Sequence, residues 1–290
     1  MRVSWLVACM LGSIVTSGAG AQTIPTIDTE DASLGSLAVG DGRFHPTMAI
    51  DLRNGDFARG GYDDDAANLD RLPVHVQLGF GFDLHRAADG KADLWLVGTS
   101  SNGVHAPGAD ERAAPRAWYE SNNLIGMVGT PAAGLTLGAA YTIKVSPNGV
   151  AGTSHETSVT AAYESETGIG ALHPSAAATV RPKGGHGLFT QAGIEPQFAV
   201  GSGDDGPTIS LPAILGVGWG GFYEAGTGTV TYGSIGLAYA YPFVVGAGHW
   251  RLRIDGAAIV RDDTLRRIGS ADAETSTVVP LVTIALATAF

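Results

Sequence analysis

Residues 280–290 read PLVTIALATAF, and this stretch decides the fold. Val282, Ile284 and Leu286 occupy every second position, with small or hydroxyl-bearing side chains between them. This period of two predicts a β-strand with one apolar face. A closing strand of this kind suits a bacterial outer-membrane β-barrel, because its last strand pairs with its first and leaves no free edge. The alternative is an ordinary edge strand of a soluble sheet.

The aromatic residue Phe290 directly follows this strand. A terminal aromatic side chain in this position resembles the sorting signal by which the bacterial barrel-assembly machinery recognises outer-membrane barrels for insertion. We therefore predict that the C-terminal strand, with Phe290 as its sorting signal, is the partner surface for that machinery.

The N-terminal residues are typical of a secretory signal peptide. Arg2 provides a positive start, residues 5–15 are mostly apolar, and the letters AGA at 19–21 form a small-x-small cleavage site. We predict a cleaved signal peptide at 1–21 and therefore export. Cys9 is the only cysteine, so the mature chain has neither disulfides nor cysteine metal sites. A lipoprotein box around Cys9 is less favoured, because few apolar residues precede it.

The composition narrows the location of the exported protein. Glycine accounts for 42 of the 290 residues and only 16% of the residues are charged, whereas a soluble protein carries about 25%. No later stretch approaches the roughly 18 consecutive apolar residues of a helical span. Low charge and high glycine content suit a sheet whose outer face contacts lipid and whose inner face is small and polar. We predict the bacterial outer membrane, with membrane lipid as a partner.

Acidic residues form clusters between the predicted strands, at 63–65, 204–205 and 262–263. The formal net charge of −11 argues against nucleic acid as a partner. Solvation of loops is the favoured explanation of the clusters, and attraction of divalent cations is the alternative.

About twelve stretches have the length and alternation of a membrane-crossing strand, which needs about 9–11 residues. The clearest is 74–85, where valine, leucine and phenylalanine alternate with residues such as His75, Gln77 and Asp83. We therefore predict an all-β fold, a transmembrane antiparallel up-and-down β-barrel of about twelve strands, within a range of ten to fourteen. The candidate strands are 44–53, 74–85, 91–101, 117–129, 135–145, 155–165, 172–181, 186–200, 208–222, 234–243, 249–260 and 277–290.

The connections favour a barrel over a sandwich. Those at 54–72, 102–116 and 262–276 are long and polar, and the interleaved ones, such as 130–133 and 244–247, are short. Long loops at one end and tight turns at the other are typical of outer-membrane barrels.

We predict one barrel domain at 44–290, preceded by a flexible periplasmic leader at 22–43, with an extra strand at 34–39 as an option. Pro174, Pro196 and Pro212 fall within candidate strands, where each would remove a ladder hydrogen bond. The strand count in that part of the chain is therefore open.

Short motifs follow one another in a characteristic order between residues 90 and 245. They are DLWL (93–96), WYE (118–120), YTIKVSPNG (141–149), HE (155–156), LHP (172–174), GIEP (193–196), LPAILG (211–216) and FYE (222–224). Their order resembles that in a family of uncharacterised Gram-negative outer-membrane β-barrel proteins, although no single motif is specific. The resemblance implies the barrel fold and the outer-membrane location, and it supplies no substrate, catalytic residue or cofactor.

The inner face of the predicted barrel carries side chains of both charge signs. Such a lumen can orient and filter small polar solutes, so we predict a narrow porin-like channel whose conductance changes when Arg251 and Arg253 are neutralised. Paired across the lumen, the same side chains would plug it, because an unpaired buried charge is costly. A closed structural or interaction barrel is therefore the alternative. The predicted lumen-facing residues are His45, Asp51, Arg53, His75, Gln77, Asp83, Asp93, Lys144, Glu195, Arg251, Arg253 and Asp255.

An outer-membrane lipid hydrolase is a less favoured alternative. Residues 99–103, TSSNG, resemble the His-x-Ser-Asn-Gly motif of outer-membrane phospholipases, in which histidine activates serine. Thr99 stands in the histidine position and cannot take a proton near neutral pH, and His105 would have to fold back onto Ser101. The HE pair at 155–156 lacks the usual helical metal-ligand spacing. We therefore expect no catalytic site, no cofactor and no metal.

Overall fold

The computed structural model describes residues 22–62, 69, 71–86, 93–108, 111, 113–201, 206–223, 226–268 and 275–290. The predicted signal peptide (1–21) and the acidic clusters at 63–65 and 204–205 lie outside the described residues. Nowhere in the described parts of the chain is a helix long and apolar enough to cross a membrane.

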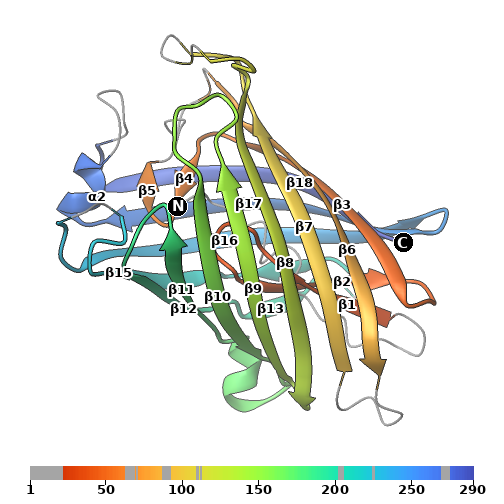
Figure 1. Ribbon diagram of the computed structural model, residues 1–290. Coiled ribbons are helices and arrows are strands. Elements are labelled where there is room, and N and C mark those ends of the chain that lie inside the picture. Colours follow the sequence, from red (N-terminus) through yellow and green to blue (C-terminus); the bar gives the residue numbers. More distant parts are fainter. Residues whose placement is uncertain are drawn as a thin grey trace.

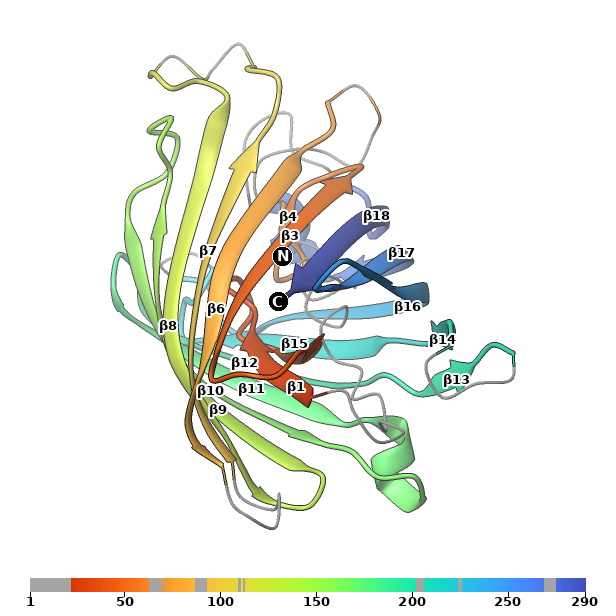
Figure 2. The same cartoon turned by 90° about the vertical axis from the view of Figure 1, so that its right-hand side faces the viewer.

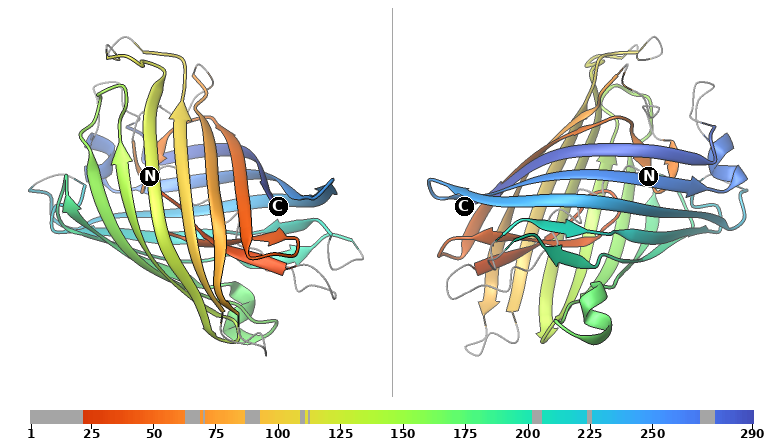
Figure 3. Two further views of the ribbon diagram at one scale, coloured as in Figure 1. Left: turned by 45° about the vertical axis from the view of Figure 1, so that its right-hand side comes forward. Right: turned by 180° about the vertical axis from the view of Figure 1, so that it is seen from behind.

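The described residues form a closed antiparallel β-barrel of twelve strands, which confirms the predicted fold (Figures 1 and 3). The sheet closes because β18 pairs with β3 on one side and with β17 on the other. The barrel strands are β3 (Phe44–Arg53), β6 (Val74–Arg86), β7 (Asp93–Val104), β8 (Trp118–Ala132), β9 (Leu135–Val145), β10 (Ser154–Tyr163), β11 (Ser175–Lys183), β12 (Leu188–Ile194) with β13 (Gln197–Ala199), β14 (Thr208–Ser210) with β15 (Ala213–Trp219), β16 (Val230–Val245), β17 (Gly248–Arg261) and β18 (Val278–Ala289).

Two neighbouring strands of the barrel are each interrupted at a proline. The first breaks into β12 and β13 at Pro196, and the second into β14 and β15 at Pro212. β12 pairs with β15 and β13 with β14, while β14 and β15 both pair with β16, so each broken pair acts as one strand. Proline has no N–H to donate to a ladder. Pro174 directly precedes β11 and interrupts no strand.

Alternate side chains of the strands point outward and form an apolar surface. On β6, Val76 and Leu78 are exposed while His75, Gln77 and Asp83 are buried, as the alternation predicts. The same alternation runs along β18. An apolar outer surface around a polar interior is the arrangement of a barrel that sits in a bilayer.

The connections at the two ends of the barrel differ in length. We call the end with 54–73, 105–117 and 262–277 the loop end, and the end with 133–134 and 246–247 the turn end. The loop-end connections include β4 (Phe57–Ala58), β5 (Gly61–Tyr62) and helix α2 (Asp263–Arg267), and the short helix η2 (Gly168–Leu172) lies at the turn end.

In place of an unstructured leader, the described residues 22–39 contain β1 (Gln22–Ile27) and β2 (Leu34–Val39), which form a hairpin inside the barrel (Figure 2). The strand considered as an option at 34–39 coincides with β2. In this N-terminal hairpin, β1 lies against β6, β7 and β8, and β2 lies against β10, β17 and β18. Ile24 and Leu37 are buried in a cluster with inward apolar side chains of the wall. Because a free hairpin would expose these side chains to water, the hydrophobic effect favours its docking in the lumen.

Glycines of the inner face provide space for the N-terminal hairpin. A Cβ atom at Gly81 on β6 would lie 3.1 Å from Ile24 Cδ1, and one at Gly126 on β8 would lie 2.9 Å from Ile27 Cδ1. Both distances are shorter than ordinary van der Waals contact. Glycine at these positions therefore lets a second layer of chain pack inside the barrel.

Candidate functional site

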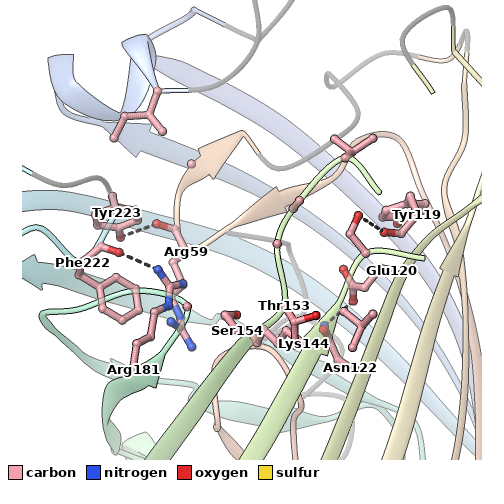
Figure 4. A pocket seen from close by; sticks show the side chains of 18 residues that line it. Arg59, Tyr119, Glu120, Asn122, Lys144, Thr153, Ser154, Arg181, Phe222 and Tyr223 are labelled. Carbon is pink, nitrogen blue, oxygen red and sulfur yellow. Dashed lines mark hydrogen bonds between the residues drawn. The ribbon is translucent and has the colours of Figure 1, made fainter. Parts of the chain in front are cut away.

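The turn of the N-terminal hairpin, residues 28–33, lies between two cavities of the lumen. Toward the loop end is a cavity of about 470 Å³, which we call the vestibule. Toward the turn end is a pocket of about 50 Å³, which we call the lower pocket. Figure 4 shows the vestibule, with Arg59 and Arg181 across the cavity from Glu120 and Asn122.

The hairpin turn bonds to the lining of both cavities. The carbonyl of Glu30 accepts hydrogen bonds from Arg59 at 2.7 Å and from Lys144 at 2.9 Å, and both of these residues line the vestibule. The carbonyl of Asp31 accepts a hydrogen bond from Gln191, which lines the lower pocket. The hairpin turn therefore contacts the lining of both cavities.

The hairpin turn is shaped by its own side chains. Asp28 Oδ1 accepts hydrogen bonds from the N–H groups of Glu30 (2.7 Å) and Asp31 (3.3 Å), and Asp31 Oδ1 accepts one from Ser33 N–H (2.9 Å). Aspartate favours such turns because its carboxylate can accept from its own backbone. Burial raises the pKa of both Asp28 and Asp31, and the nearby carboxylates raise that of Asp28 further. Both carboxyl groups are therefore easier to protonate here than in water.

Glu156 on β10 gathers three cations in the wall of the vestibule. Arg59 lies against two neighbouring phenylalanine rings, 4.7 Å from the centroid of Phe189 and 4.8 Å from that of Phe222, and donates to both Glu156 oxygens at 3.0 and 2.7 Å. Lys144 at 3.3 Å and Arg181 at 3.0 Å share the same carboxylate. Glu156 is therefore the shared partner of three basic side chains.

A second ion cluster joins β17 to the break between β12 and β13. Arg253 donates to Glu195 at 2.9 Å and to Asp255 at 2.8 Å, and Ser210 donates to Glu195 at 2.6 Å. All four residues are buried. Mutual pairing offsets part of the cost of removing these charges from water.

Asp51 on β3, His75 on β6 and Glu120 on β8 lie in one row across the inner face. Asp51 is directly opposite His75, and Gly103 on β7 lies between His75 and Glu120. Asp51 Oδ1 is 3.2 Å from His75 Nδ1, and Tyr119 Oη is 2.7 Å from His75 Nε2. An irregularity in the pairing of β7 with β8 leaves Tyr119 and Glu120 both buried on the inside, as a β-bulge can do by re-aiming a side chain.

Most of the predicted lumen-facing residues are buried. Asp93 is half-buried at the beginning of β7, and the side chain of Lys144 is 19% exposed beside the vestibule. The structure brings His75 to Asp51 and Glu195 to Arg253, which belong to the two separate clusters described above. The buried ones are His45, Asp51, Arg53, His75, Gln77, Asp83, Glu195, Arg251, Arg253 and Asp255.

The structure does not bring His105 to Ser101. Ser101 is completely buried on the inner face of β7, and its hydroxyl has no hydrogen-bond partner among the described residues. His105 Nε2 instead lies 3.0 Å from Glu111 Oε1, and its Nδ1 lies 2.9 Å from the Ala106 carbonyl. The serine therefore has neither the histidine base nor the access to lipid that the phospholipase motif requires.

Several residues in and beside the vestibule were not predicted from the sequence. Glu30 and Arg59 lie in segments predicted as a leader and a loop, so no periodicity indicated that they are buried. Glu156, Ser158 and Thr160 are buried on the inner face of β10, and they alternate with the exposed Thr157 and Val159. That alternation is the signal that could have identified Glu156.

No protein-family model and no curated protein sequence matches this chain. Among solved structures, the chain is similar to an outer membrane channel from Pseudomonas putida F1, with a TM-score of 0.54 and 10% identity over 88% of this chain and 97% of that one. Weaker similarities connect it to CdiB from Escherichia coli (TM-score 0.41, 11% identity, 93% of this chain and 68% of that one). The similarity to the anion-selective porin from Comamonas acidovorans is weaker still, with a TM-score of 0.37 and 12% identity over 86% of this chain and 99% of that one.

The similarity to the Pseudomonas putida structure shows a shared barrel fold. A closed barrel satisfies all of its backbone hydrogen bonds internally, and an apolar outer surface lets it lie among lipid chains. The twelve-strand barrel and its apolar outer surface support a location in the bacterial outer membrane.

Proposed function

We propose that the protein is an outer-membrane channel for small polar solutes that is closed in this structure by its N-terminal hairpin. The observation that carries the proposal is the position of the hairpin turn between the vestibule and the lower pocket. Withdrawal of the hairpin would join these cavities along an interior lined by side chains of both charge signs. A lumen of this kind favours hydrated polar solutes.

The attachment of the hairpin supports its role as a gate. Within the described residues, β1 and β2 form a two-stranded sheet of their own, separate from the barrel sheet. The hairpin can therefore leave without breaking a ladder hydrogen bond of the barrel. Its attachment includes apolar packing of residues such as Ile24, the hydrogen bonds at Glu30 and Asp31, and an ion pair of Arg53 with Glu30.

The size of the barrel supports a passage for small molecules. Barrels of about 8 strands are filled by their own side chains, and those of about 16–18 strands leave an open channel. A lumen of twelve strands that accommodates a hairpin has enough width for a small solute once the hairpin is displaced.

A closed structural or interaction barrel is the second candidate, and a specific observation favours it. Arg53 with Asp51 and Arg253 with Asp255 form buried pairs on the inner face. Mutual pairing lowers the cost of holding these charges in a lumen that does not fill with water.

A reversible covalent lock distinguishes the two candidates. A Cβ at Gly81 would lie 3.4 Å from Ile24 Cβ, close to the roughly 3.5–4.5 Å found in disulfides. The double variant Ile24→Cys/Gly81→Cys can therefore tie the hairpin to β6 under oxidising conditions. We expect single-channel conductance in planar bilayers to be absent in the oxidised variant and to return on reduction.

The controls for the lock are the two single-cysteine variants, which should conduct equally in both redox states. Deletion of residues 22–39 should give a permanently open channel. Silence of the wild type, of the reduced variant and of a folded deletion variant would contradict the channel and favour the closed barrel. Membership in the family of uncharacterised outer-membrane barrels remains a prediction.

A further inference from the structure

Three side chains of metal-binding type meet in the lumen beside the vestibule. Glu30 of the hairpin turn, His75 of β6 and Glu120 of β8 each offer one ligand atom, and these atoms all lie within 4.8 Å of one another. All three residues are buried. Because they come from three distant segments, no local sequence spacing indicates the cluster.

The wall is built to hold the imidazole in this position. A Cβ at Gly103 would lie 3.0 Å from His75 Nε2 and 2.7 Å from Tyr119 Oη. Glycine is therefore the residue that leaves room for the ring between β6 and β8. The irregular pairing beside Gly103 keeps Glu120 on the same inner face.

The hydrogen bonds of His75 leave Nε2 as the ligand atom. Asp51 can only accept a hydrogen bond when ionised, so His75 Nδ1, at 3.2 Å, carries the proton. The lone pair of Nε2 then accepts from the Tyr119 hydroxyl at 2.7 Å. A carboxylate that bonds the far nitrogen of an imidazole is the usual support of a metal-binding histidine.

We propose that Glu30, His75 and Glu120 bind a divalent transition-metal ion, which ties the N-terminal hairpin to the barrel wall. The ion would take the Nε2 lone pair that Tyr119 now occupies, and the Tyr119 hydroxyl would move aside or stay as a neighbour. Tyr119 and Glu120 line the vestibule, so an ion can enter from the loop end.

The carboxylates of the cluster supply the charge for a divalent cation, and the nearby Arg59 and Lys144 bond the carbonyl of Glu30 and pair with Glu156. Arg53 lies 3.8 Å from Glu30 Oε2 and is also bonded to Asp51, which offsets its charge. Glu30 and Glu120 then supply two negative charges. One imidazole with two carboxylates suits Zn²⁺ and related ions, whereas Mg²⁺ and Ca²⁺ prefer oxygen ligands alone.

The consequence for gating rests on the proposed function, whereas the metal site itself does not. Glu30 belongs to the hairpin while His75 and Glu120 belong to the wall, so the ion can form its full ligand set only when the hairpin is docked. A ligand that binds only the docked state shifts the equilibrium toward it. Zn²⁺ should therefore keep the channel closed.

The site is tested with Zn²⁺ and the detergent-purified full chain by equilibrium dialysis. We expect one high-affinity ion per wild-type barrel. Outer-shell partners alone are worth about 10–100-fold in affinity, so Glu30→Gln, His75→Gln and Glu120→Gln should each weaken binding by about 100-fold or more. Gly103→Ala should weaken it without removing a ligand.

The matched control removes another histidine–carboxylate pair, His173 and Glu164, whose atoms lie 3.5 Å apart at the turn end. The double variant His173→Gln/Glu164→Gln should bind Zn²⁺ as the wild type does. Glu30→Gln alters only the hairpin, so it remains informative if a wall variant fails to fold. Unchanged binding in folded Glu30→Gln and Glu120→Gln variants would overturn the metal site.

Conductance in planar bilayers separates the site from the gate. Zn²⁺ should lower the open probability of the wild type and leave Glu30→Gln unaffected. Zn²⁺ binding with unchanged conductance would keep the metal site and overturn its link to gating. A barrel that is silent in every condition contradicts the channel, and dialysis still decides the metal site.

Discussion

Arg59, on the connection between β3 and β6, forms a two-pronged ion pair with Glu156 on β10, with Nη1–Oε1 and Nη2–Oε2 distances of 3.0 and 2.7 Å. The pair fastens a loop-end connection to the barrel wall above the hairpin turn. Lys144 and Arg181 also contact Glu156. Removal of the Glu156 carboxylate therefore affects three ion pairs, whereas removal of the Arg59 guanidinium affects one of them.

The stability of the cluster should depend more on Glu156 than on Arg59. Glu156→Gln leaves three cations without their shared carboxylate, and loss of one partner of a buried pair costs about 3–5 kcal/mol. Arg59→Met leaves Glu156 still paired with Lys144 and Arg181, so it should cost less. Urea unfolding followed by tryptophan fluorescence measures both variants. A larger loss for Arg59→Met than for Glu156→Gln would contradict this account.

Closure by the hairpin should strengthen at acid pH. Burial raises the pKa of Asp28 and Asp31 in the docked hairpin. After release of the hairpin into water, we expect both groups to have the ordinary pKa of an aspartate, about 3.9. A group with a raised pKa in the docked state contributes fully to docking below its released-state pKa. That contribution is lost as the pH rises through the docked-state pKa. The open probability of single channels should therefore increase with pH above about 4.

Two variants test whether the charge of the hairpin turn causes this pH dependence. Asp28→Asn keeps an acceptor for the turn and cannot ionise, so it should flatten the dependence. Asp41→Asn removes an exposed carboxylate outside the turn and should leave the dependence unchanged. If the open probability still depends steeply on pH in an Asp28→Asn/Asp31→Asn double variant, the explanation is wrong.

The cost of placing a charged side chain on the outer surface should depend on the depth of that position in the membrane. Leu237 in the middle of β16 and Val245 at its turn end are similarly exposed, at 57% and 60%. Arginine on the lipid face costs about 2–4 kcal/mol at the bilayer midplane and about 0–1 kcal/mol near the interface. Leu237→Arg should therefore destabilise the barrel in lipid vesicles much more than Val245→Arg. Equal effects in urea unfolding would contradict the assigned membrane position.

Removal of the Phe290 side chain should lower the yield of assembled barrel in cells. Phe290→Ala is preferable to deletion, because the backbone of Phe290 bonds Pro46 and its carbonyl lies 2.9 Å from His45 Nδ1. Heat-modifiable migration in outer-membrane fractions measures assembly. If Phe290→Ala assembles as the wild type does, the role of this residue as a sorting signal is lost, although the barrel fold is unaffected.

Strand alternation explains how much of the wall could be predicted. Residues 44–53 match β3 residue for residue, and the inward His75, Gln77 and Asp83 follow from the period of two on β6. Strand alternation did not predict the structure where the chain departs from regular strand pairing. Prolines interrupt the strands at 196 and 212, and the irregular pairing at Tyr119 adds an inward side chain that strict alternation does not foresee.

The sequence by itself determined the barrel, its lipid-facing surface and most of the polar side chains that line its inside. These depend on the alternation of neighbouring residues, which is a local property of the chain. Only the tertiary structure decided that residues 22–39 fill the lumen and that Glu30, Arg59 and Glu156 meet beside the vestibule. The physical reason is that docking depends on the shape and charge of an interior assembled from many strands. That interior exists only after the barrel has closed, so no single stretch of sequence predicts it.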